Sequence, residues 1–386
     1  MSIEIANYNE KDDKELLALF YKSTYHQKKE FEYFRFPPKW IHRYLDQDTI
    51  IRIAKINGKI VASLGAILFY GRVNGKKQKI AFFVDNCILP EMHSNYFEIF
   101  DKLFEEIEKE AKKKKVKLIF GWDFVNRVEK HKKVFEKRKY EQINGFYWYP
   151  AGSDLRISLG AKKENQLGML WKIVLRFGRW NISLKNKMHR KEEQLSIEKI
   201  NKNDLGKVAD FINLHNKDVQ FSMVYTKKHL QKIFNDKIAH GLIAKKGDTI
   251  ESVLLYFVGA WSGWMFGKPH YSKNHSFFFA YTPFEFILRD KRKTNIAAHL
   301  VFELLTQNEE YIKNKGYSLF VDCFWEKEQW RENSLKLVGG EKAEFDFGCV
   351  LIKNLSGKKI SYNKIYLPSL FVIAPIPRDY KKHIGD

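Results

Sequence analysis

Two distant stretches of the chain repeat the same order of apolar and polar positions. Ile3 to Ser23 and Ile197 to Asn216 each contain a short apolar segment, a polar break rich in Asn and Asp, and apolar residues at helical spacing. This order predicts a strand, a helix N-cap supplied by the polar break, and an amphipathic helix. Self-similarity at so long a separation indicates a duplicated unit.

The later parts of the two halves match as well. Phe104 to Phe124 and Glu303 to Trp325 each predict a helix, a lysine-containing turn and an apolar strand. A charged helix is expected next in each half, over Val128 to Lys139 and over Lys327 to Val338, and then an aromatic-rich last strand. The chain is therefore expected to be a duplicated α+β unit of roughly 150 residues per copy.

Hairpin-like strands are expected between these flanking segments. Ile50 to Ile56 and Ile60 to Phe69 are joined by Asn57-Gly58-Lys59, which is favourable turn chemistry. The remaining predicted strands are Gln78 to Leu89 in the first half, and Gly241 to Lys245, Ser252 to Gly259 and Ser276 to Tyr281 in the second.

Composition narrows the class of protein. A length of 386 residues favours two domains, and 44% hydrophobic residues with 15% aromatics can form substantial cores. The cysteines, Cys87, Cys323 and Cys349, show no C-x-x-C spacing, which argues against a disulfide framework or a zinc site. The start of the chain has no signal-peptide pattern, and no apolar run is long enough to cross a bilayer. We expect a cytoplasmic protein.

The charge is strongly positive, with a formal net charge of +22. Such a field favours nucleic acid, an acidic membrane leaflet or a phosphate-bearing cofactor. Lys112 to Lys115 ends the predicted helix Phe104 to Lys115 and is interpreted as a solvated last turn stabilised by the helix dipole. Arg289 to Lys293 precedes a predicted helix and is a candidate phosphate site, although solvated cations explain it equally well.

A basic amphipathic segment, Leu167 to Lys187, lies between the halves. Its apolar and basic positions fall on opposite sides of a helical wheel, and Trp171 and Trp180 flank them. One interpretation is a linker helix packed across the two domains. The alternative is a helix in a peripheral, anionic membrane interface.

The order of elements resembles the GNAT superfamily. A tandem pair further resembles N-myristoyltransferases, bacterial tandem GNAT acyltransferases and, more distantly, the Fem-type peptidoglycan aminoacyltransferases. Phe34-Arg35-Phe36 looks like the F-R-F segment of N-myristoyltransferases, and Gly316 to Asp322 with Leu335 to Gly340 is similar to their G-F-D-V-F and K-L-K-F-G elements.

The resemblance implies an α+β (α/β layered) chain of two tandem GNAT folds, each a mixed, mostly antiparallel sheet flanked by helices. The expected boundaries are residues 1–155 for the first GNAT domain, 156–194 for the basic linker, 195–356 for the second GNAT domain and 357–386 for a C-terminal tail.

The resemblance also implies a site. In the superfamily, strand four splays from strand five, and the pantetheine arm of coenzyme A lies in the opening. Backbone N–H groups at a bulge in strand four polarise the thioester carbonyl, and the next loop binds the pyrophosphate. Here strand four corresponds to Lys79 to Leu89 and the loop to Pro90 to Phe97, which lacks the glycines of the family pattern. Tyr96 stands near the position of the first glycine.

Five residues are candidates for catalysis and seven for cofactor binding. In the catalytic group, Asp85 is a candidate base or a residue that holds a backbone turn, Cys87 a catalytic candidate or simply a small packing residue, and Asp322 a group that orients the amine. Tyr96 and Tyr140 are candidates to protonate the leaving thiolate. The cofactor-binding candidates are Asn86, Ile88, His93, Ser94, Asn95, Arg289 and Arg292. His93 is also a candidate base.

The resulting hypothesis is an N-acyltransferase that uses acetyl-CoA or a longer acyl-CoA and no metal. Its acceptor would be an amine on a small molecule, a peptide or a lipid-linked compound. A Fem-like transferase that uses aminoacyl-tRNA is an alternative that the positive charge favours. A catalytically silent binding module for an acidic partner is another, because both predicted phosphate loops lack glycine. P-loop, G-x-S-x-G and H-E-x-x-H motifs do not occur.

Overall fold

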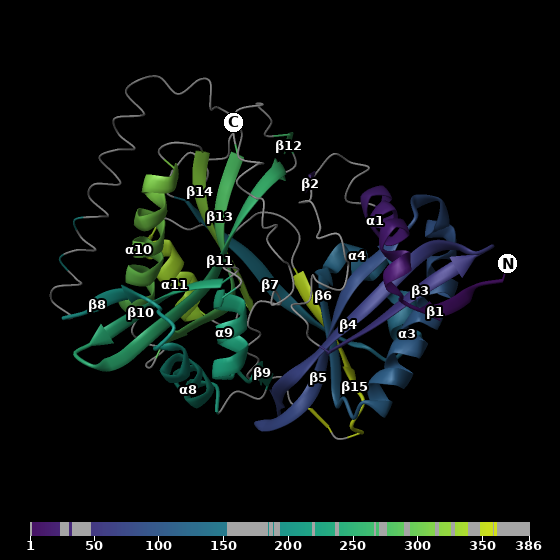
Figure 1. Ribbon diagram of the computed structural model, residues 1–386, viewed down its shortest axis with the longest axis horizontal. Helices are drawn as coiled ribbons and strands as arrows, with labels where there is room; N and C mark the ends of the chain where they lie inside the picture. Colours follow the sequence, from purple (N-terminus) through teal and green to yellow (C-terminus); the bar gives the residue numbers. More distant parts are fainter. Residues whose placement is uncertain are drawn as a thin grey trace. The chain divides into compact units, whose positions relative to one another are not determined.

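The chain divides into two compact units. Unit 1 comprises Met1–Phe146, Asp218–Val224 and Asp346–Pro377, and unit 2 comprises Tyr147–Lys217, Tyr225–Phe345 and Arg378–Asp386. The computed structural model describes residues 2–23, 31–32, 48–152, 184, 188, 194–217, 221–235, 239–265, 268–269, 276–288, 294–312, 316–325, 329–338, 348–357 and 359–360. Each unit is a mixed sheet with helices (Figure 1).

The elements of unit 1 are β1 (Glu4–Asn7), η1 (Glu10–Asp12), α1 (Asp13–Lys22), β2 (Phe31–Glu32), β3 (Asp48–Ile56), β4 (Lys59–Val73), β5 (Lys76–Ile88), η3 (Pro90–Asn95), α3 (Tyr96–Lys113), β6 (Leu118–Phe124), α4 (Val125–Lys130), α5 (Lys132–Lys137), the first part of β7 (Glu141–Gly152), β9 (Phe221–Met223) and β15 (Gly348–Asn354). In the sheet, β1, β3, β4 and β5 follow one another in antiparallel pairs, and β6 joins β5 in parallel.

The hairpins of unit 1 follow from their turn residues. The β3–β4 turn has positive φ at Asn57 (51°) and Gly58 (77°), and the β4–β5 turn repeats this at Asn74 (51°) and Gly75 (73°). Positive φ at both central positions is the type I′ geometry that matches the twist of a hairpin. The predicted turn at Asn57-Gly58 is thereby confirmed.

Strand β4 lies in the middle of the core. Positions 60 to 68 are buried in succession rather than alternately, as expected for a strand covered on both faces. Helix α3 packs on β3 and β4, and α1 packs on β4 and β5. The buried side of α3 presents Ile99, Phe100, Leu103, Phe104 and Ile107 at helical spacing.

A strand from the end of the chain completes the first sheet. β15 pairs antiparallel with β6 along its whole length, with Cys349 opposite Asp123, and it also pairs with the first part of β7. The short strand β9 adds to the outer end of β4, where Phe221 to Met223 pair with Gly71 to Val73. The aromatic-rich strand expected at the end of the second half therefore forms its sheet contacts in unit 1.

The elements assigned to unit 2 are the remainder of β7, β8 (Ser196–Lys199), α8 (Leu205–His215), α9 (Lys227–Asn235), β10 (Ala239–Lys246), β11 (Thr249–Met265), β12 (Lys268–Pro269), β13 (Ser276–Leu288), α10 (Thr294–Ile312), β14 (Gly316–Trp325) and α11 (Gln329–Leu337). Strands β8, β10, β11 and β13 pair antiparallel, and β13 pairs with β14 in parallel. This is the connectivity of unit 1 a second time.

The polar break supplies an N-cap in the first copy of the repeat. The side chain of Asn9 accepts from Lys11 N, while the Asp12 carboxylate accepts from Asn9 N, and these bonds satisfy donors at the start of η1. In the second copy, Asn201 accepts from Asn203 N, and the Asp204 carboxylate accepts from Asn201 N. These bonds close the turn before α8, whose N-cap residue Asp204 makes no side-chain cap bond, so the predicted side-chain cap forms only in the first copy.

Two predicted segments differ from the structure or fall outside it. The single helix expected over Val128 to Lys139 is wrong, because His131 leaves helical geometry (φ −114°, ψ 15°) and separates α4 from α5. Of the predicted helix at 167–187, only Leu184 is among the described residues. Residues 361–386 of the predicted tail are outside the described part of the chain.

Candidate active site

Strands β5 and β6 separate partway along their length. Their parallel pairing joins Ile80–Phe82 to Leu118–Phe120 and extends no further along these described strands. β6 continues straight beside β15, and the ring of Phe83 packs on Gly121, where an added Cβ would lie 3.2 Å from the ring. Beyond Phe82, the β6-facing edge of β5 is therefore released from the sheet.

A β-bulge follows on β5. Val84 pairs with Gly65 and Cys87 with Ser63, so Asp85 and Asn86 together face the single residue between those partners on β4. Asp85 has φ 54°, a left-handed value that Asp tolerates better than most residues. The hydroxyl of Ser63 donates to the backbone carbonyl of Asp85 at 2.9 Å and fixes the bulge. A bulge of this kind turns backbone groups out of the regular ladder.

Tyr96, the first residue of α3, packs beside the bulge. Its ring stacks between Phe100 (centroids 4.2 Å apart) and His131 (3.6 Å), and the amide of Asn86 donates to its hydroxyl at 3.5 Å. Burial raises the pKa of Tyr96, so the phenol stays protonated at neutral pH. Of the predicted residues, the structure thus brings Asp85, Asn86 and Tyr96 together.

The η3 turn between β5 and α3 contains three further predicted residues. Ser94 donates to the side chain of Asn95 at 3.2 Å on the exposed surface. His93 is half-buried, and its Nδ1 is a buried atom with no hydrogen-bond partner among the described residues. Burial lowers the pKa of His93, and the nearby charges of Lys130 and Arg127 lower it further. His93 is therefore held neutral with an unused polar atom.

Helix α4 supplies positive charge that the η3 turn lacks. Arg127 forms an ion pair with Asp123 (3.3 Å), and both Arg127 and Lys130 act electrostatically on His93 and His131. Burial lowers the pKa of His131 to about 4, with contributions from Lys130, His93 and Arg127. The sequence analysis did not single out Arg127, Lys130 or His131; it placed Lys130 and His131 within a continuous charged helix over Val128 to Lys139. The basic run after β6 was the available signal.

Cys87, Ile88 and Tyr140 occupy packed positions. Cys87 and Ile88 are both 4% exposed and continue β5 beyond the bulge. Tyr140 donates its hydroxyl to Glu108 of α3 at 3.0 Å, and burial raises the pKa of both groups. In this arrangement the Tyr140 hydroxyl uses its proton in a buried hydrogen bond to Glu108, so that proton is not available to a thiolate.

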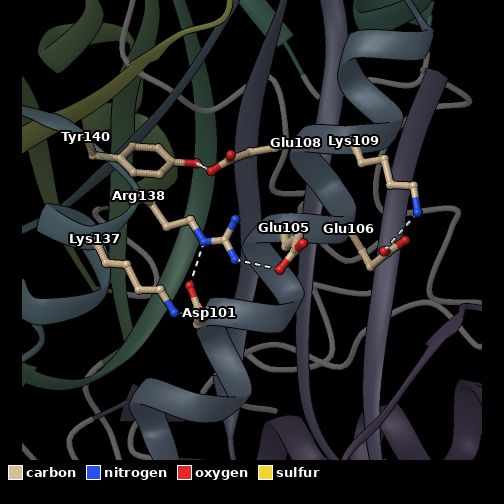
Figure 2. Close-up of polar contacts among 8 residues, drawn as sticks. All are labelled: Asp101, Glu105, Glu106, Glu108, Lys109, Lys137, Arg138 and Tyr140. Carbon is tan, nitrogen blue, oxygen red and sulfur yellow. Dashed lines mark hydrogen bonds and ion pairs between the residues drawn. The ribbon is translucent and has the colours of Figure 1, made fainter.

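Figure 2 shows that this bond belongs to a row of contacts along α3. Arg138 donates to Asp101 at 2.6 Å and to Glu105 at 2.8 Å, and Lys137 also pairs with Asp101 at 2.6 Å. The acidic residues lie one helical turn apart, so one face of α3 holds the segment that follows α5. The row therefore ties the end of α5 and the residues that follow it to α3.

The second unit repeats the splay and the irregularity. β13 pairs with β14 from Ser276 to Tyr281 and no further among the described pairs, and β13 then carries Thr282 to Phe284 opposite one residue of β11. Pro283 lies in this bulge and has no N–H to donate. Asp322 lies on β14, beyond its pairing with β13, and Arg289 and Arg292 lie outside the described residues.

The described residues include neither a group of metal ligands nor a membrane-spanning helix. There, no group of His, Cys, Asp and Glu side chains could hold a metal ion. In the same part of the chain, every helix is too short or too polar to cross a membrane.

Solved structures share this arrangement of elements. Saccharomyces cerevisiae N-myristoyltransferase, solved with bound myristoyl-CoA and inhibitors, matches with a TM-score of 0.60 over 96% of this chain and 86% of its own, at 10% sequence identity. The chain has the tandem GNAT fold.

Two bacterial structures extend the comparison. A probable N-acyltransferase from Enterococcus faecalis matches with a TM-score of 0.52 at 11% identity, over 92% of this chain and 73% of its own. A GCN5-related N-acetyltransferase from Anabaena variabilis also gives 0.52, at 9% identity, over 90% and 72% of the two chains. No family model and no curated protein sequence matches the chain significantly. The expected fold class is confirmed, and at these identities the likeness concerns the fold alone.

Proposed function

We propose that the chain is an N-acyltransferase that moves an acyl group from acyl-CoA directly to an amine. The observation that carries this proposal is the bulge at Asp85 on the released edge of β5. Backbone N–H groups near such a bulge can hydrogen-bond the thioester oxygen and stabilise the negative charge that develops there. The fold comparisons support acyl transfer as the general chemistry.

The side chains around the bulge suit the proton transfers. The half-buried Asp85 accepts a proton from the incoming ammonium group, and the neutral amine nitrogen then attacks the thioester carbon. As the tetrahedral intermediate collapses, the carbon–sulfur bond breaks, the thiolate takes the proton of the Tyr96 hydroxyl, and the nitrogen releases its second proton to solvent to give the neutral amide. The raised pKa of Tyr96 keeps this proton in place until the thiolate forms. Solvent then restores both groups.

The phosphates of the donor are assigned to the start of α3 and the adjoining face of α4. Backbone N–H groups at the start of a helix favour an anion, and Arg127 and Lys130 add two cations. The buried Nδ1 of His93 offers a further polar contact. In this proposal Arg127 and Lys130 of α4 bind the pyrophosphate in place of the glycine-rich loop of the family pattern.

The first half is proposed to hold the donor. Both halves have a splayed strand pair and an irregular strand, yet only the second places a proline within its irregularity. Pro283 removes one backbone donor at the position where the oxyanion needs it. Unit 2 would then serve the acceptor, an amine on a small molecule, a peptide or a lipid-linked compound.

A thermal-shift panel tests the proposal before the acceptor is known. The panel compares CoA, acetyl-CoA, a medium-chain and a long-chain acyl-CoA with tRNA and with buffer. A ligand at 100 times its dissociation constant stabilises the folded state by about 2.7 kcal/mol, which is readily detected. Stabilisation by the CoA series supports the proposal. Stabilisation by tRNA alone favours the aminoacyl-tRNA alternative, and stabilisation by neither favours the silent binding module.

A further inference from the structure

Cations gather at the end of unit 1 that is opposite the bulge along β5. The β4–β5 hairpin and the last turn of α3 meet there, because Lys117, just after α3, donates its backbone N–H to the carbonyl of Lys79 on β5 (2.9 Å). Lys79 and Lys114 also share Asp48, at 2.9 and 2.7 Å. The hairpin and the helix end therefore form one continuous surface.

Register places the charged side chains on the same face. Tyr70 pairs directly with Lys79, and Arg72 pairs directly with Lys77, so all four residues project from the hairpin on the side of Asp48. Residues 112 to 115 add four lysines at the adjoining end of α3, and Lys114 among them shares Asp48 with Lys79 of the hairpin. We call this surface the basic face; its cations are Arg72, Lys77, Lys79, Lys112, Lys113, Lys114 and Lys115.

Acidic residues neutralise only part of the basic face. Asp48 bonds Lys79 and Lys114, and Glu110 lies near Lys113 (3.5 Å) and Arg52 (3.8 Å). Lys77, Lys112 and Lys113 are solvent-exposed. Lys112 also acts electrostatically on Glu108. Since seven cations meet these three acids, a net positive surface faces solvent.

We propose that the basic face docks unit 1 on an anionic phospholipid surface. Six of its seven cations are lysines, whose mobile ammonium groups suit a diffuse layer of negative headgroups. The one arginine, Arg72, donates to the carbonyl of Gly75 (3.4 Å) within the hairpin turn.

The position of Tyr70 is also consistent with docking on a phospholipid surface. It is 55% exposed at the rim of the face, with Lys77 Nζ 5.1 Å from its ring centre. An exposed tyrosine beside lysines is suited to the headgroup level of a bilayer. Specific recognition of RNA would instead favour several stacking aromatics and arginine forks, whereas Tyr70 is the one large exposed aromatic of this face among the described residues.

Vesicle co-sedimentation tests the proposal with two matched variants. K77Q/K112Q/K113Q removes three cations from the basic face, and K11Q/K14Q/K59Q removes three exposed lysines from the α1 side of unit 1. Both variants change the net charge equally. The vesicles contain phosphatidylcholine alone or with 30% phosphatidylglycerol, and a mixed-sequence single-stranded RNA is tested in parallel by fluorescence polarisation.

The proposal predicts binding to the anionic vesicles only. Each lysine of the basic face should contribute roughly fivefold to the partition constant, so K77Q/K112Q/K113Q should bind about a hundredfold more weakly than the wild type. The control variant should bind like the wild type, because its three lysines lie outside the basic face. Binding should also disappear at 1 M salt, where the Debye length is about 3 Å. Equal losses in both variants, no vesicle binding by the wild type, or RNA binding without vesicle binding would each overturn it. Circular dichroism of both variants excludes misfolding as the cause.

Discussion

The left-handed backbone at Asp85 predicts how two substitutions there change the stability of the protein, and it distinguishes the contribution of the backbone conformation from that of the carboxylate. A residue with a Cβ pays about 1–2 kcal/mol in the left-handed region, Asp and Asn less, and a β-branched residue the most. Asp85 has φ 54°, and Ser63 holds its carbonyl. We therefore expect Asp85→Val to lower the free energy of unfolding by about 2 kcal/mol, and Asp85→Gly to leave it within about 0.5 kcal/mol of wild type.

Guanidinium chloride denaturation measures both changes. Unit 1 falls in the range of 150–250 residues, where 1 kcal/mol corresponds to about 2–4 °C in melting temperature, so its thermal unfolding gives a second estimate. Gln78→Val is the matched control, because Gln78 is also half-buried on β5 but pairs regularly with Gly71. Valine favours regular strands, and the control should change stability by less than about 0.5 kcal/mol. If Asp85→Val is tolerated as well as Gln78→Val, the bulge does not require a left-handed residue and the reasoning fails.

Three further predictions concern the surroundings of the bulge. Tyr96→Phe keeps the ring stack and removes the hydroxyl, so kcat should fall about a hundredfold with little change in KM for acyl-CoA. Release of the CoA thiol measures both constants, and an unchanged kcat would show that Tyr96 is not the acid. The pKa of His131 is lowered from 6.5 to about 4 in the folded state, so the unfolded chain binds the proton first and the free energy of unfolding should decline as pH falls from about 6.5 towards 4. Denaturation at several pH values should show this decline reduced in His131→Phe, and an identical decline in the variant would contradict the assignment. In Gly121→Ala the added Cβ would lie 3.2 Å from the Phe83 ring, so the free energy of unfolding should fall by about 1 kcal/mol in the same denaturation assay, whereas an unchanged value would mean that the Phe83 ring moves aside and is not fixed against β6.

The sequence was informative where local chemistry decides the structure. The Asn57-Gly58 turn and the Asn9 cap use short-range preferences, and both form as expected. The duplicated pattern and its resemblance to the GNAT superfamily also predicted the fold. Those signals depend on residues that lie close together in the chain or on a repeat visible along it.

Long-range pairing decides the features that the sequence did not reveal. No local preference indicates that β15 pairs with β6, more than 200 positions earlier in the chain, or that the His131 ring stacks on Tyr96. The electrostatic effect of the α4 cations on His93 of the η3 turn is likewise a contact between segments that lie apart in the chain. At Asp85, a polar residue in an apolar strand was visible from the sequence, whereas its positive φ requires the structure.

Isothermal titration calorimetry with a medium-chain acyl-CoA tests the central claim most directly, because it needs no acceptor and reports the number of sites. The account predicts saturable binding at one site per chain for the wild type and for Asp85→Gly, and much weaker binding for Asp85→Val, whose bulge is disturbed. Absence of saturable binding by the wild type, two sites per chain, or full binding by Asp85→Val would contradict the assignment of the donor to the β5 bulge.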